Sequence, residues 1–172
     1  MGDVLSELTN WISQSWLREQ VLYLLFNVPG LPPLVQSVHL LAVAMLMASI
    51  GLISMRVLNL AVPGQQLGEM VGRLAGWFMT SIVLLIVSGL PFVIARPERY
   101  FSNPVFAAKA LAVLVLGIGA MWFLSHLRQQ VKVVEVTRRL LIRTRIFALC
   151  LLVLLVFALF AGRWIAYVDY LY

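Results

Sequence analysis

Residues 74–95 read LAGWFMTSIVLLIVSGLPFVIA, a stretch of 22 residues without a single charged side chain. An α-helix rises 1.5 Å per residue, and about 20 residues of helix cross the hydrocarbon core of a bilayer. A helix of this length in a soluble protein would carry a polar face toward water. The stretch therefore predicts a transmembrane helix, and it sets the class of protein to which the chain belongs.

Three further apolar runs of similar length occur in the chain, at residues 34–55, 105–127 and 146–168. Hydrophobic residues make up 62% of the sequence and charged residues 12%, whereas soluble domains carry about 25% charged residues. The formal net charge of +6 is concentrated at the ends of the apolar runs, which indicates a membrane surface and not nucleic acid. We predict an all-α membrane protein, a bundle of four transmembrane helices whose partner is the lipid bilayer.

The distribution of charge between the two sides of this bundle predicts its orientation. The segments 56–73 and 126–145 together hold eight Lys or Arg residues and two Glu residues. The other side, with both termini and the loop at 96–103, has five basic and five acidic residues. Because cytoplasmic loops carry the excess of Lys and Arg, both termini are expected on the outer side, an N-out/C-out topology.

The first 30 residues form a separate segment ahead of a transmembrane domain at 31–172. Leu5, Leu8, Ile12 and Trp16 recur at three- to four-residue spacing, which predicts one amphipathic helix over residues 3–26. Such a helix would lie in the membrane interface or cap the bundle. The single Cys150 lies inside the fourth apolar run and is expected in the core.

Three residues that are basic or titratable enter different apolar runs from the outer side, namely His39, Lys109 and Arg163. At 1.5 Å per residue, each lies about 6–8 Å below the outer interface. The four runs contain no carboxylate at that depth. The pattern predicts an outward-facing polar pocket for an anionic or electron-rich group, such as a haem propionate, a quinone carbonyl or a lipid phosphate. The alternative is that Lys109 and Arg163 extend to the headgroups while His39 makes one ordinary hydrogen bond.

A haem in this pocket would take its axial nitrogen from His39, with Lys109 and Arg163 beside the propionates and Tyr100 and Tyr167 nearby. The other histidine, His126, lies at the cytoplasmic end of the third run. Two histidines a membrane thickness apart cannot ligate one iron. Ligation of one haem by two histidines of the same chain is therefore excluded.

Three stretches carry a family resemblance: VHLLA at 38–42 with MRVLNL at 55–60, SGL at 88–90 with RYFSNPVF at 99–106 and Lys109, and GRWIAY at 162–167. In order and spacing they resemble an uncharacterised family of bacterial four-helix membrane proteins. More distantly, the chain is similar to the copper-resistance D-like and HemJ-type protoporphyrinogen oxidase membrane proteins. The latter bind haem b and have a histidine in the first helix and a lysine in a later one. The resemblance implies His39 as an axial ligand, Lys109 as a base or propionate partner, and the bacterial inner membrane as the location.

The sequence therefore predicts a small integral membrane protein of a redox or metal-linked system. It would hold haem b, or a quinone, in the outward-facing pocket and exchange electrons with a periplasmic partner. The alternative from a different class is a non-catalytic accessory subunit that packs beside a larger membrane complex. Whether the protein is an enzyme, and whether it forms a homo-oligomer, are left open by the sequence.

Overall fold

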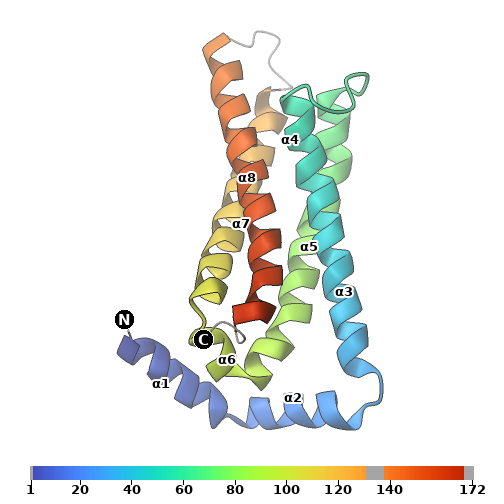
Figure 1. The fold of residues 1–172 in the computed structure, drawn as a ribbon. Helices are drawn as coiled ribbons and strands as arrows, with labels where there is room; N and C mark the ends of the chain where they lie inside the picture. The colour runs from blue at the N-terminus through green and yellow to red at the C-terminus, as the bar shows by residue number, and fades with distance from the viewer. Residues whose placement is uncertain (1, 131–137, 169–172) are drawn as a thin grey trace.

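The computed structural model describes residues 2–130 and 138–168, and its regular elements are all helices (Figure 1). In chain order they are α1 (Gly2–Ser13), α2 (Trp16–Asn27), α3 (Leu31–Leu46), the π-helix η1 (Met47–Gly51), α4 (Leu52–Val57), α5 (Leu67–Ala95), α6 (Pro97–Phe101), α7 (Pro104–Gln130) and α8 (Arg138–Val168).

Four helices are long and apolar enough to cross a bilayer: Leu31–Val57, Leu67–Ala95, Pro104–Gln129 and Ile142–Trp164. The first of them joins α3, η1 and α4 into one rod. The first three predicted apolar runs lie within one rod each, and the fourth, 146–168, begins within Ile142–Trp164 and ends with α8, so the prediction of four long apolar helices is confirmed. Helices of this kind indicate a multi-pass membrane protein.

The four rods form two pairs of antiparallel neighbours. α3 packs most extensively on α5, and α7 packs most extensively on α8 (Figure 1). α1 and α2 lie across one end of the bundle, close to α6, and this end is called the α2 end below. The loop after α4 and the first turn of α8 lie at the opposite end, called the α4 end.

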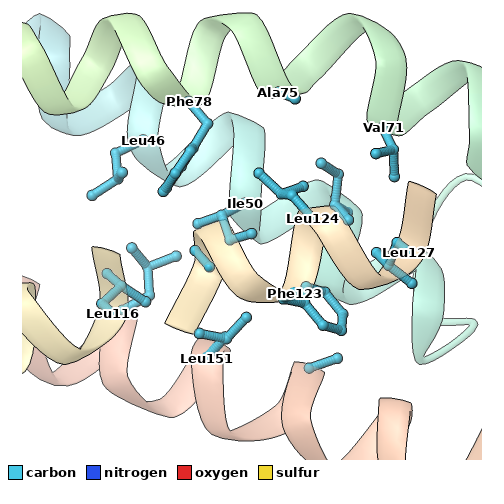
Figure 2. Packing of buried hydrophobic residues seen from close by; sticks show 14 of the residues in the cluster. Leu46, Ile50, Val71, Ala75, Phe78, Leu116, Phe123, Leu124, Leu127 and Leu151 are labelled. Carbon is cyan, nitrogen blue, oxygen red and sulfur yellow. The ribbon is translucent and has the colours of Figure 1, made fainter. Parts of the chain in front are cut away.

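Apolar side chains from all four rods meet in one cluster inside the bundle (Figure 2). Phe78 of α5 and Phe123 of α7 are fully buried there, against Ile50 of η1. The wide π-turn brings three consecutive residues, Ser49 to Gly51, into the buried interior, and the Ser49 hydroxyl donates to the Met45 carbonyl at 2.8 Å. This cluster begins at Leu46 and extends toward the α4 end.

The outward faces of the rods are apolar as well. Large exposed side chains include Leu40, Val83, Ile118 and Val153, one from each rod. Helices that are hydrophobic on all sides suit lipid and not water. Cys150 is exposed among these side chains, so its predicted place in the core is wrong. An all-round apolar helix gives no sequence signal for which face is inside.

The amino-terminal segment forms two helices instead of the single predicted one. Ser15 caps α2, because its hydroxyl accepts from the Arg18 backbone N–H at 3.3 Å, and the chain turns there. The predicted apolar stripe is broken at this turn: Ile12 is half-buried, whereas Trp16 is 70% exposed. The Arg18 Nε donates to the Ala95 carbonyl at 3.4 Å, which holds α2 against the last turn of α5.

Candidate ligand site at the α2 end of the bundle

His39 lies on the inward face of α3. Buried Ala42 follows His39 by three residues, and buried Leu46 follows Ala42 by four, so the three residues share one face of the helix. Its half-buried ring lies against Gly89 of α5, where an added β-carbon would be 3.4 Å from the ring Cε1. The absence of a side chain at Gly89 therefore lets the imidazole lie against the backbone of the neighbouring helix.

The hydrogen bonds around Ser88 determine which ring nitrogen of His39 carries the proton. The Ser88 hydroxyl lies 2.5 Å from the Leu84 carbonyl oxygen, and a carbonyl only accepts, so the single hydroxyl hydrogen is donated there. The Ser88 Oγ also lies 2.9 Å from His39 Nδ1. With its hydrogen already used, Oγ accepts from an Nδ1–H. The neutral ring therefore keeps its lone pair on Nε2.

Lys109 lies on the inward face of α7, where it precedes buried Ala112 and Leu116 in the same periodic order. Its half-buried side chain crosses to α8 and ends at Gly162. An added β-carbon at Gly162 would lie 3.1 Å from Nζ and 3.4 Å from Cε. The ammonium group thus lies in a notch beside Gly162, and a larger residue at this position would require it to shift.

The two polar residues belong to opposite halves of the bundle and approach each other at the α2 end. His39 is seated within the α3–α5 pair, and Lys109 within the α7–α8 pair. Among the described residues, no carboxylate lies within ion-pair distance of Lys109. A ring nitrogen lone pair and an ammonium group therefore lie at the same end of the bundle, with no resident anion in the described part of the chain.

The other three predicted site residues are placed less centrally. Arg163 follows Gly162 directly, but its side chain is exposed. Tyr100 lies in α6, where its half-buried ring packs edge-on against Phe106 with centroids 5.1 Å apart. Tyr167 belongs to the last turn of α8, and its side chain lies outside the described residues. The structure thus brings together His39 and Lys109 out of the predicted set.

Sequence reasoning did not assign roles to Ser88, Gly89 and Gly162. The available signal was the Ser88-Gly89 pair within an uncharged run. A helix that packs against a histidine ring of its neighbour needs a hydrogen-bond acceptor and a position without a side chain, and this pair provides both. The register between neighbouring helices decides which glycine faces which polar residue. That register is a property of the folded bundle and cannot be read along one helix.

A family model described as "Family of unknown function (DUF6644)" matches residues 30–168, from the residue before α3 to the last residue of α8. The match includes His39, Ser88, Lys109 and Gly162. No curated protein and no solved structure matches the chain. Membership of an uncharacterised family agrees with the resemblance described above, and the more distant similarity to copper-resistance D-like and HemJ-type proteins stays a prediction. The chain belongs to the DUF6644 family.

Proposed function

We propose that this family member is an integral protein of the bacterial inner membrane that holds haem b at His39 and exchanges electrons with a periplasmic partner. The observation that carries the proposal is the contact of His39 Nδ1 with the Ser88 hydroxyl, which donates to Leu84 and so assigns the lone pair of the neutral ring to Nε2, inside an apolar bundle. Histidines that bind a metal characteristically donate their other N–H to a fixed acceptor, as His39 does to Ser88. Haem would supply one-electron chemistry, and the chain would supply its binding and environment.

The donor set of the site fits haem b. Nε2 of His39 would hold the iron, and the Lys109 ammonium would pair with a propionate, since no described carboxylate neutralises it. The four-carbon stem of Lys109 would let the ammonium leave the Gly162 notch to do so. Arg163, exposed one residue beyond the notch, adds a second cation at the same level.

A quinol would use the same donor pattern with different atoms. Its hydroxyl would donate to Nε2 of His39, and its second oxygen would accept from Lys109. Nε2 of the neutral ring accepts and does not donate, so this tautomer favours a quinol over a quinone at His39. An optical spectrum separates the two ligands, because haem has a Soret band and a quinol does not.

The orientation of the protein in the bilayer is part of the proposal. The positive-inside rule puts the α4 end in the cytoplasm and the α2 end in the periplasm. α1 and α2 lie across the bundle end, with Trp11 74% and Tyr23 63% exposed, as suits helices lying in the outer interface (Figure 1). Cysteines introduced at Thr9 and Gln65 test it: a membrane-impermeant thiol reagent applied to intact spheroplasts should label the first and spare the second.

The decisive measurement of the ligand is an optical spectrum of the detergent-purified protein, first oxidised and then reduced with dithionite. His39→Ala is compared with His126→Ala, which removes the other histidine near the α4 end and serves as the matched control. A Soret band that shifts on reduction, persists in the control and disappears in His39→Ala is the expected result. A flat spectrum from wild-type protein expressed with ample haem would overturn the haem proposal.

A second candidate function is that of an accessory subunit beside a larger membrane complex. Gly72 and Gly76 favour it, because they lie four residues apart on the exposed side of α5 with no atom within 4 Å of an added β-carbon at either. Small residues at this spacing let another transmembrane helix approach closely. Under this candidate, the purified protein is colourless and leaves the membrane together with a much larger partner. Gly72→Leu would abolish that association.

A further inference from the structure

An aromatic stack lies at the surface between α7 and α8, nearer the α4 end. The Trp122 and His126 rings are almost parallel, with centroids 5.2 Å apart and planes inclined by 6°. Phe147 of α8 packs on Trp122 with centroids 4.9 Å apart. The stack is exposed to the surroundings, since Trp122 is 56% accessible. Trp122 therefore belongs to the outward surface, whereas Phe147 is half-buried and packs on the fully buried Phe123 of the core.

Arg143 lies at the same level of this surface as His126. It is four residues before Phe147, so both lie on one face of α8, while His126 is four residues after Trp122 on one face of α7. The two helices are antiparallel neighbours, so these two steps of four lead toward the same α4 end. The exposed Arg143 and the His126 ring therefore lie on the α4-end side of the contact between Trp122 and Phe147, and these four residues are called the Trp122 surface below.

Arg143 is the basic residue of this surface. Residues 122–129 and 142–147 contain three exposed arginines and no acidic residue, but Arg128 and Arg145 are two residues from His126 and Arg143 and therefore lie on other helix faces. Toward the middle of the bundle, the same surface continues as exposed aliphatic side chains, among them Ile118 and Ile146. A planar aromatic ring at the boundary between a basic and an aliphatic surface suits the interface of a bilayer.

We infer that the Trp122 surface binds the phosphate of an anionic phospholipid, with Arg143 as its main contact, Trp122 at the glycerol level and the acyl chains along the aliphatic surface of α7 and α8. Arginine is suited to phosphate because its planar donors bind two oxygens at once. The site rests on insertion of the bundle in a bilayer. It is independent of the ligand at His39, which lies at the opposite end.

The test uses full-length protein in phosphatidylcholine vesicles with increasing fractions of brominated phosphatidylglycerol, which quenches nearby tryptophan fluorescence. The Trp122 signal is the difference between wild type and Trp122→Phe. Arg143→Gln should weaken the apparent affinity for phosphatidylglycerol about fivefold, which corresponds to one basic residue near an anionic surface. Arg73→Gln is the matched control, since Arg73 is exposed on α5 at the same end but is not part of the Trp122 surface.

A loss in Arg143→Gln with unchanged affinity in Arg73→Gln supports the site. Equal losses in both variants would overturn it, because they would show only a general attraction of basic residues to anionic lipid. Equal quenching by brominated phosphatidylcholine would also overturn it. If millimolar inorganic phosphate competes with the lipid in wild type, the natural ligand is a free phosphate ion and the lipid proposal is overturned.

Discussion

Replacement of Ser88 by alanine is the most direct test of how the candidate site is organised. Ser88 is 3% exposed and provides the acceptor for His39 Nδ1 at 2.9 Å. Ser81, two turns earlier on the same inward face of α5, is the matched control, because it is fully buried and its hydroxyl donates to Phe78 of its own helix. Both substitutions remove one buried hydroxyl from one helix, and only Ser88→Ala takes an acceptor from another helix.

The expected magnitude follows from this difference. A buried donor left without an acceptor costs about 1–3 kcal/mol, and hydrogen bonds between transmembrane helices have been worth about 0.6 kcal/mol on average and 1.7 at most. Ser88→Ala should therefore lower the free energy of unfolding by about 1–2 kcal/mol more than Ser81→Ala. Titration of the folded protein in mixed micelles with sodium dodecyl sulfate measures both values.

Nitrogen chemical shifts of the His39 imidazole provide an independent readout. In wild type, Nδ1 should show the shift of a protonated ring nitrogen and Nε2 that of an unprotonated one. Ser88→Ala should produce a mixture of both tautomers, whereas Ser81→Ala should leave the assignment unchanged. Equal destabilisation by the two substitutions would refute the assigned role of Ser88. A protonated Nε2 in the wild-type protein, when the His39 ring is neutral, would refute it as well.

Two further predictions concern the notch and the core. Gly162→Leu should displace the Lys109 ammonium and lower the free energy of unfolding by about 1–3 kcal/mol through overpacking. Gly72→Leu, in open space, should change it by about 0.5 kcal/mol or less in the isolated protein. An equal loss in both variants would contradict this. Phe123→Ala should lower the free energy of unfolding by about 3–5 kcal/mol because the ring is fully buried. Phe160→Ala should lower it by about 1 kcal/mol or less, because Phe160 is 67% exposed. The same unfolding titration measures both values, and a similar loss at the two positions would show that the buried cluster does not stabilise the bundle.

The number and type of the long helices could be predicted because uncharged runs have few alternative structures. Their ends could not be predicted as well. α8 begins at Arg138, eight residues before the predicted run, and α5 begins at Leu67, seven residues before it. Helices continue beyond the apolar core into charged sequence, because arginine is a good helix former and Glu69 suits the first turn of α5. Hydropathy marks where lipid ends, and not where the helix ends.

The candidate site could be predicted in part for a related reason. Depth along a helix follows from counting residues, so His39 and Lys109 could be placed at one level from the sequence. Rotation about the helix axis is decided by packing, and it left the Arg163 side chain exposed. The break at Ser15 was also missed, because periodicity over residues 3–26 outweighed the capping preference of serine. The role of these residues as a cofactor site stays a prediction.

The uneven distribution of contacts along the bundle has a mechanical consequence. Large apolar side chains join the two helix pairs toward the α4 end, whereas the α2 end is joined by short side chains and by the His39–Lys109 region. α6 also joins the two pairs at this end, because it follows α5 in the chain, packs on α7 and contacts α1. Rotation of one pair against the other therefore meets its greatest resistance at the core, and a force on α1 reaches both pairs. A displacement of α1 would thereby act on the α3–α5 pair through α2 and Arg18, and on the α7–α8 pair through α6.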